Sequence, residues 1–256
     1  MDLTAAAQFL NTAFSGFDRA FLGLQHAISV PLGGILTPLM RIITLLGEKG
    51  IIFFLLALGM MCFPKTRRLG VCIFGAVCCG ALITNLILKD FVARPRPFET
   101  LDIYRRWWEA IGAPAEDGFS FPSGHVTAAA AGMTALWIRN GKKWMFPAIL
   151  WVFIMCFIRN YLMAHYPSDC LFAAGIGALS GVIAHLITEL IFYITERNSG
   201  TVWADFILDW SLPDFAGIPS KLGLLEKQNR RTENNRPVQH ESGKGSASGY
   251  VGKHLK

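Results

Sequence analysis

Residues 69–88 read LGVCIFGAVCCGALITNLIL, an uncharged run of 20 residues between Arg68 and Lys89. A helix needs about 20 mostly apolar residues to cross the hydrocarbon of a bilayer. The composition agrees with a membrane chain, because 52% of the 256 residues are hydrophobic and 16% are charged, whereas soluble domains carry about 25% charged residues. The segment therefore predicts a membrane-spanning helix that ends at a cation.

Four further apolar runs accompany this segment. Two of them are long enough to span the bilayer, and two have only 15 residues each, so that they must extend into polar flanks or thin the bilayer locally. The long runs are 119–138 and 170–188, and the short ones are 50–64 and 144–158. We therefore predict an all-α, polytopic membrane bundle with five or six transmembrane helices, in which residues 47–198 form the transmembrane core.

The N-terminal residues 1–46 leave two interpretations open. Their apolar residues fall at roughly helical spacing but are interrupted by charges, so an amphipathic helix lying in the interface fits as well as a first span. Pro31, Pro38 and the pair Gly33-Gly34 are expected to break the segment into pieces. The first 30 residues lack a basic start and a compact apolar core, so we expect no cleavable signal peptide.

Most of the net positive charge of the chain lies in its C-terminal tail. Of the net charge of +6, most comes from residues 221–256, which hold eight Lys or Arg and three Glu. A basic tail beside a membrane indicates topology or attraction to anionic lipid rather than binding to nucleic acid. We expect residues 199–225 to lie in the interface and residues 226–256 to form a disordered, cytoplasmic tail.

Two loops without acidic residues orient the predicted bundle. Residues 65–68 and residues 139–143 each carry three cations, and the positive-inside rule assigns both loops to the cytoplasm. Counting spans alternately then places residues 89–121 and 159–169 on the opposite face. The sequence therefore predicts a multi-pass cell-membrane protein with its polar span ends on the extracytoplasmic side.

Three short polar motifs lie at span ends on that predicted face. They are K-x6-R-P at 89–97, P-S-G-H at 122–125 and R-x5-H-x3-D at 159–169. Each alone has an ordinary explanation, as an interfacial anchor, a helix start or a structural histidine. Their occurrence in this order on one face is not expected by chance, and charged groups at span ends usually serve a function. Together they supply cations, a hydroxyl, two imidazoles and a carboxylate, which suit phosphoryl transfer through a covalent histidine.

These motifs resemble those of the type 2 phosphatidic acid phosphatase (PAP2) superfamily, which includes glucose-6-phosphatase and the vanadium-dependent haloperoxidases. The resemblance covers roughly residues 69–190, a four-helix catalytic core. It departs from the family pattern at Ile158, where the family usually has Ser, and Arg94 is a cation that the motif does not require. The residues carried over are Lys89, Arg96, Ser123, Gly124, His125, Arg159, His165 and Asp169.

The resemblance implies a phosphate cradle made of cations and a helix start. Lys89, Arg96 and Arg159 would hold the non-bridging oxygens, since Arg binds them bidentately and Lys acts as a point charge. Ser123 and Gly124 at the start of a helix would add a hydroxyl and backbone N–H groups. No Asp or Glu cluster suited to a metal lies near the motifs, so we expect neither a metal nor another cofactor.

The resemblance also implies two roles for histidine. We expect His165 to be the nucleophile, because Asp169, in the first turn of a helix that begins at Pro167, can accept a hydrogen bond from Nδ1 of His165. His125 would be the general acid. The histidines outside the motifs, His26, His185, His240 and His254, are interpreted as structural or solvated, and the six cysteines as packing residues.

The function implied is a metal-independent phosphatase acting on a membrane lipid phosphate or diphosphate, of the undecaprenyl diphosphate, phosphatidylglycerophosphate or phosphatidate type. A lipid phosphotransferase that uses the same phosphohistidine is one alternative. A catalytically silent lipid-binding member is another, to which Ile158 is the only pointer. A haloperoxidase is disfavoured because those enzymes are soluble. The sequence does not indicate which lipid is the substrate or how many copies assemble.

Overall fold

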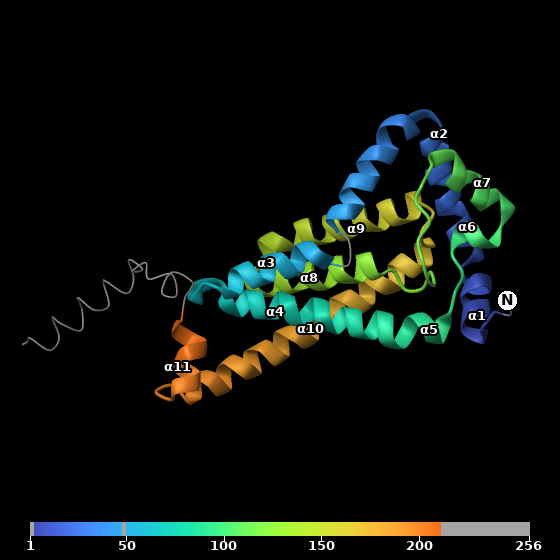
Figure 1. Ribbon diagram of the computed structural model, residues 1–256. Helices are drawn as coiled ribbons and strands as arrows, with labels where there is room; N and C mark the ends of the chain where they lie inside the picture. The colour runs from blue at the N-terminus through green and yellow to red at the C-terminus, as the bar shows by residue number, and fades with distance from the viewer. Residues whose placement is uncertain (1–2, 48–49, 211–256) are drawn as a thin grey trace, which may run out of the picture. The chain divides into compact units, whose positions relative to one another are not determined.

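The computed structural model describes residues 3–47 and 50–210, and within these ranges the chain is helical, without strands (Figure 1). This confirms the predicted all-α class. The principal helices are α1 (Ala5–Ala13), α2 (Ser15–Leu46), α3 (Ile51–Met61), α4 (Pro64–Ala81), α5 (Lys89–Val92), α6 (Pro97–Thr100), α7 (Asp102–Ile111), α8 (Gly124–Asn140), α9 (Met145–Tyr161), α10 (Pro167–Arg197) and α11 (Val202–Asp209). A π-helix, η2 (Leu82–Leu88), joins α4 to α5, and a short 3₁₀ helix, η3 (Lys142–Trp144), precedes α9.

Four helical segments of the described chain are long and apolar enough to cross a membrane. They are Ser15–Leu45, Pro64–Thr100, Lys142–Tyr161 and Pro167–Arg197. The predicted short span at 50–64 is the 11-residue helix α3. The run predicted at 119–138 begins as a helix only at Gly124 and forms α8, most of which is buried in the bundle.

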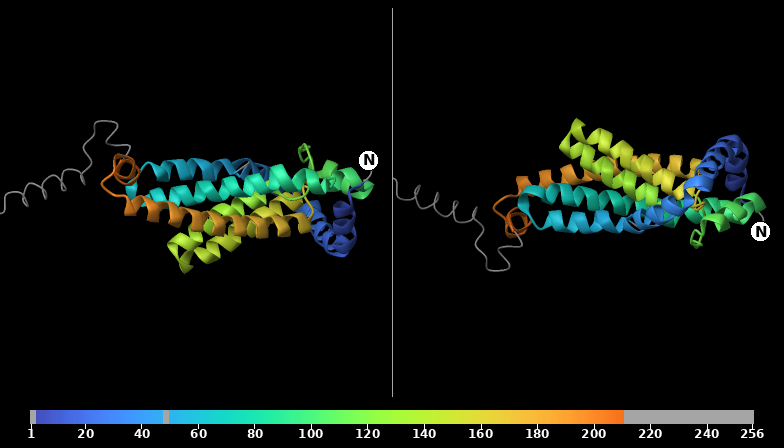
Figure 2. Two further views of the ribbon diagram at one scale, coloured as in Figure 1. Left: turned by 90° about the horizontal axis from the view of Figure 1, so that it is seen from below. Right: turned by 90° about the horizontal axis from the view of Figure 1, so that it is seen from above.

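Helix α8 lies at the centre of the bundle and packs against α4, α9 and α10 (Figures 1 and 2). Small residues allow the close approach of α8 and α10: a Cβ added at Gly177 of α10 would lie 2.4 Å from the backbone oxygen of Thr127. Small residues at helix contacts are typical of membrane bundles, in which van der Waals packing replaces the hydrophobic drive. Large apolar side chains such as Ile149, Phe153 and Leu186 point outward, as expected for a surface in contact with lipid.

Helix α2 is continuous, so the prediction that Pro31, Pro38 and Gly33-Gly34 break this segment into pieces is wrong. The helix bends into an arch instead (Figure 1). Proline has a helical φ and removes only one backbone hydrogen-bond donor. A long apolar helix can therefore contain proline and bend at that position without ending. The first part of α2 reaches the end of the bundle where α1, α5 and α7 lie.

The two basic loops lie at the end of the bundle opposite the three motifs (Figure 1). Arg68 pairs with Glu196, and Arg139 pairs with Glu189, both acids belonging to the last turns of α10. The first turn of α10 carries Asp169 of the third motif. Of the predicted interfacial segment, α11 forms a helix on which Trp203 and Phe206 are exposed. The predicted tail at 226–256 lies outside the described residues.

The contact between α8 and α10 makes a prediction for two glycines of one helix. Gly177→Ala should lower the free energy of unfolding by about 1–3 kcal/mol, the usual cost of overpacking, because its Cβ meets backbone. Gly175→Ala is the matched control, since no atom lies within 4 Å of a Cβ at that position. Unfolding of both variants in detergent measures the difference, and equal stability of the two variants would contradict the packing described.

Candidate active site

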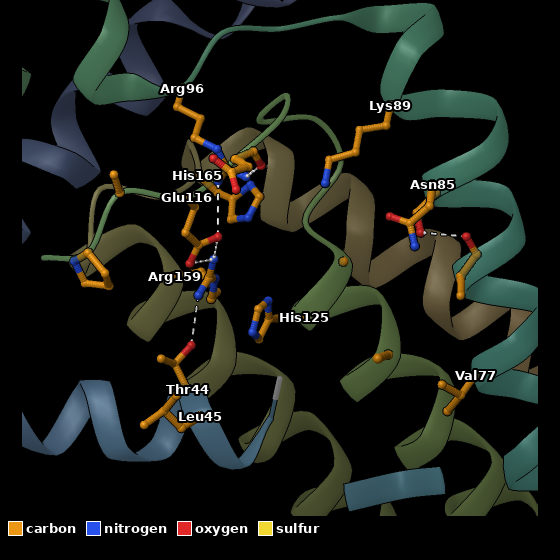
Figure 3. A pocket seen from close by; sticks show the side chains of 17 residues that line it. Thr44, Leu45, Val77, Asn85, Lys89, Arg96, Glu116, His125, Arg159 and His165 are labelled. Atoms are coloured by element: carbon orange, nitrogen blue, oxygen red, sulfur yellow. Dashed lines mark hydrogen bonds and ion pairs between the residues drawn. The ribbon is translucent and has the colours of Figure 1, made fainter. Parts of the chain in front are cut away.

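A cavity of about 580 Å³ lies at the end of the bundle where the three motifs meet (Figure 3). Its wall is built from the end of α2, the α4–η2–α5 segment, the loop before α8, and the ends of α8 and α9. Six of the eight predicted site residues line it: Lys89, Arg96, Gly124, His125, Arg159 and His165. The structure therefore brings together residues that lie up to 76 positions apart in the sequence.

The first motif reaches the cavity through a change of helix type. The span predicted as one regular helix turns into the π-helix η2 before Lys89, and Thr84 and Asn85 of η2 line the cavity. Short π-helical stretches occur often at functional sites, because the extra residue in the turn redirects side chains. Figure 3 shows Lys89 reaching from α5 toward His165.

Arg96 of the same motif donates its hydrogen bonds mainly to backbone carbonyl oxygens. Its guanidinium donates to the carbonyl oxygens of Gly118 and Asp117, both at 2.9 Å, and to that of Ala164 at 2.8 Å. The side chain is almost wholly buried. Arg96 therefore ties the loop before α8 to the residue that precedes His165, in addition to presenting positive charge to the cavity.

The second motif forms the start of α8, as predicted. Ser123 is the N-cap residue and Gly124 the first helical residue. The first N–H groups of a helix have no partner within the helix, so this end can receive an anion. The hydroxyl oxygen of Ser123 is buried and makes no hydrogen bond with the described residues. His125 follows and points into the cavity (Figure 3).

Arg159 of the third motif is wholly buried in the last turn of α9. Its Nη1 donates to the hydroxyl of Thr44 at 2.9 Å, and its Nη2 contacts both carboxylate oxygens of Glu116. Its Nε has no partner among the described residues. A buried donor without an acceptor is rare in proteins, and here it belongs to a side chain that lines the cavity.

His165 is held in one tautomer by a backbone carbonyl. Its Nδ1 lies 2.6 Å from the carbonyl oxygen of Ser120, which can only accept, so Nδ1 carries the proton and Nε2 keeps its lone pair. Burial lowers the pKa of His165 well below its ordinary value, and Arg159 and Arg96 lower it further. The imidazole is therefore neutral, the form that a nucleophile requires.

The predicted hydrogen bond between Asp169 and His165 is wrong. The carboxylate of Asp169 accepts from Nη1 of Arg94 at 2.6 Å, from the hydroxyl of Ser120, and from the backbone N–H of Tyr166 at 3.0 Å. Asp169 is the third residue of α10, from which a carboxylate turns back to the N-terminus of its own helix. It is linked to the imidazole of His165 through Ser120, whose carbonyl oxygen lies at Nδ1.

Arg94, which the motif did not require, is the centre of a buried polar cluster. Besides Asp169, its guanidinium contacts Asp18 at 2.8 Å, the hydroxyl of Ser168 at 2.8 Å and Asn11 at 2.8 Å. Asp18 also accepts from the backbone N–H and the hydroxyl of Ser168, each at 2.8 Å. The cluster joins α1 and α2 to the start of α10. Asp18 interrupts an apolar stretch of the sequence, which was the one signal of its burial.

Glu116 is the acidic residue of the cavity that contacts the predicted phosphate-binding arginines, and its role was not predicted. It comes from the loop between α7 and α8 and contacts Arg159, while its Oε2 lies 3.4 Å from Nη1 of Arg96. Burial by itself would raise the pKa of Glu116, but Arg159 and Arg96 outweigh burial and hold the pKa below its ordinary value. The carboxylate is therefore ionised and sits on two of the predicted phosphate-binding cations.

Other polar residues that the sequence singled out lie away from the cavity. His26 stacks on Trp107 with ring centroids 4.3 Å apart, which fits its structural interpretation. His240 and His254 lie outside the described residues. Among the residues that the structure describes, no group of three His, Cys, Asp or Glu side chains gathers in a way that could hold a metal ion.

Comparison with known proteins identifies the class of this site. Residues 70–193 match the PAP2 superfamily, and this range contains every residue of the three motifs. The part of the chain that holds the three motifs is therefore similar to the PAP2 superfamily. No solved structure matches the chain.

Two curated relatives are similar to the chain. Undecaprenyl-diphosphatase BcrC of Bacillus subtilis (strain 168) is 28% identical over 175 residues, which cover 68% of this chain and 83% of the relative. Lipid A 4'-phosphatase of Bacteroides thetaiotaomicron is 30% identical over 142 residues, which cover 52% of this chain and 63% of the relative. The chain thus spans most of the first relative and less than two thirds of the second.

The buried cluster around Arg94 makes a prediction for Asp18. Asp18→Ala should lower the free energy of unfolding by about 3–5 kcal/mol, the cost of removing one partner of a buried ion pair. It should also slow phosphate release, because Arg94 and Asp169 hold Ser120 and thereby His165. Denaturant unfolding and activity assays in detergent measure both effects. Asp90→Ala on the exposed side of α5 is the control, and a similar result for the two variants would contradict the cluster's role.

Proposed function

We propose that this PAP2 phosphatase hydrolyses a lipid-linked phosphate or diphosphate through a phosphohistidine formed on His165. The observation that supports this most is the set of groups that face one cavity: three cations, two imidazoles and a helix start. The unpartnered Nε of Arg159 and hydroxyl of Ser123 add two buried groups that an oxyanion would satisfy.

The first step transfers the phosphoryl group to the enzyme. Nε2 of His165 attacks phosphorus, the N–P bond forms and the bond from phosphorus to the leaving oxygen breaks. His125 donates a proton to that oxygen, so the lipid leaves as an alcohol or as a monophosphate. Lys89, Arg96 and Arg159 bind the non-bridging oxygens, whose charge such a site must stabilise in the transition state.

The second step returns the enzyme to its starting state. Water attacks phosphorus opposite Nε2, His125 accepts the proton of the water, and the N–P bond breaks to release inorganic phosphate. The Ser120 carbonyl keeps the proton of His165 on Nδ1 throughout, so Nε2 is again a neutral nucleophile. Three cationic side chains line the cavity and can meet the charge of the phosphoryl group, which supports a reaction without a metal.

The lining of the cavity supports a substrate that comes from the bilayer. Leu45 lines the cavity and is 65% exposed on the outer side of α2, while Val77 and Ala81 of α4 line the same apolar side. Figure 3 shows Leu45 and Val77 at one side of the cavity, opposite Lys89 and Arg96. A lipid can therefore place its chain beside α2 and α4 with its phosphate on the cations. The names of the two relatives, a lipid diphosphatase and a lipid A phosphatase, fit this class of substrate.

We further propose that the cavity opens on the extracytoplasmic face. The basic loops at 65–68 and 139–143 lie together at the other end of the bundle, where positive charge favours the cytoplasm. The substrate would then be a lipid whose headgroup is displayed on the outer leaflet.

The proposed reaction is tested by phosphate release from a panel of lipid phosphates and diphosphates in detergent. Wild-type protein should release phosphate, and His165→Ala should lower kcat by more than about 10⁴-fold, because the nucleophile is lost. His185→Ala, which removes an imidazole of α10 far from the cavity, should keep wild-type activity. If His165→Ala retained more than about a hundredth of kcat, as after loss of acid–base assistance alone, the nucleophile would be another residue.

The proposed orientation is tested by labelling in intact cells. In a variant without its native cysteines, Glu109→Cys on exposed α7 should react with a membrane-impermeant thiol reagent, and Lys142→Cys should not. Lysis should make both positions reactive, which controls for local accessibility. The reverse pattern in intact cells would place the cavity on the cytoplasmic face.

A further inference from the structure

We propose that Glu116 is a resident carboxylate that occupies the phosphate position between turnovers and weakens the binding of the inorganic phosphate product. The inference rests on the proposed function, since it names the group that competes with phosphate at the same cations. It makes Glu116 a residue that keeps weakly bound anions, such as inorganic phosphate, from remaining in the cavity.

The contacts of Glu116 are those that a phosphoryl group needs. Both of its carboxylate oxygens contact Nη2 of Arg159, and Oε2 also approaches Nη1 of Arg96 at 3.4 Å. A carboxylate and a phosphate present similar pairs of oxygens to a guanidinium. The negative charge of Glu116 is therefore bound where the substrate's charge has to be placed.

Most of the N–H donors of Arg159 and Arg96 already have partners, so few remain for a phosphate. In Arg159, Nη1 donates to Thr44 and Nη2 is taken by Glu116, so that Nε alone is unpartnered among the described residues. In Arg96, the carbonyl oxygens of Asp117, Gly118 and Ala164 take most of the donors. A phosphate that binds Nη2 of Arg159 must therefore displace Glu116.

Glu116 is placed so that it can move. The loop between α7 and α8 contains Gly112 and Gly118, with φ of +60° and +73°, one on each side of Glu116. Residues other than glycine rarely adopt a positive φ, so these two positions define where the loop turns. The side chain of Glu116 is 27% exposed whereas that of Arg159 is 0% exposed. The carboxylate can therefore reach water when it leaves, and Arg159 stays in place for the incoming anion.

The competition weakens the binding of lipid phosphates and of free phosphate alike, but it leaves the two with different affinities. Each must pay the same cost of displacing an ionised carboxylate from two arginines. A lipid substrate gains additional free energy from its chain and headgroup contacts, whereas inorganic phosphate has only its own charge. A lipid substrate therefore still binds after it displaces Glu116, whereas free phosphate is left with little affinity, and the return of Glu116 to Arg159 helps to expel phosphate after hydrolysis.

The inference is tested by the binding of inorganic phosphate to the full-length protein in detergent. Glu116→Gln keeps the size of the side chain and removes its charge, so calorimetry should show phosphate binding at least about tenfold more tightly than in wild type. KM for a lipid phosphate should fall as well, because the substrate displaces the same carboxylate. Glu109→Gln, which removes a charge from exposed α7, is the control and should bind phosphate as wild type does.

A second variant keeps the test valid if Glu116→Gln does not fold. Glu116→Asp keeps the charge but withdraws the carboxylate by one methylene from Arg159, and it should bind phosphate more tightly than wild type, by a smaller factor than Glu116→Gln. An affinity for phosphate within twofold of wild type in the folded variants would overturn the inference. Calorimetry needs no turnover, so an inactive wild type would refute the proposed function while tighter phosphate binding in the variants still supported the role of Glu116.

Discussion

The buried ion pairs of Arg94 with Asp18 and Asp169 are the constraint on which the rest of the site depends. Charges buried in a protein are stable only when they are paired and hydrogen-bonded. Here Asp18 comes from α2, Asp169 from α10, and Arg94 from the segment between α5 and α6. Through Ser120, this cluster also fixes the carbonyl that holds His165. The first turns of α2 are therefore linked to the imidazole of His165, although they lie outside the range that matches the PAP2 superfamily.

A second constraint is the balance of charge inside the cavity. The cations that suit a phosphate would repel one another in its absence, because they lie close together at low solvent exposure. Glu116 relieves this repulsion by pairing with Arg159 and Arg96. The same carboxylate thus stabilises the empty site and competes with the anion that fills it. Charge balance and competition with phosphate therefore depend on one side chain of the loop between α7 and α8.

Much of this arrangement could be predicted from sequence, because its signals are local. Uncharged runs such as 69–88 predict membrane helices, and the fixed spacing from Arg159 to Asp169 predicts a polar helix end. Contacts between distant residues have no such signal. The pairing of Asp18 with Arg94 and of Glu116 with Arg159 depends on how the helix ends meet in space. The predicted bond from Asp169 to His165 failed for the same reason, since Arg94 and Ser120 lie closer to that carboxylate.

The central claim is that His165 carries the phosphoryl group during turnover. Its most direct test is to mix the protein with a lipid phosphate labelled in the phosphoryl group, to stop the reaction within one turnover, and to map the label by mass spectrometry under alkaline conditions, in which phosphohistidine survives. We predict a single modified peptide with phosphate on the imidazole of His165. Label on His125, or release of phosphate in the first turnover without any labelled histidine, would contradict the account.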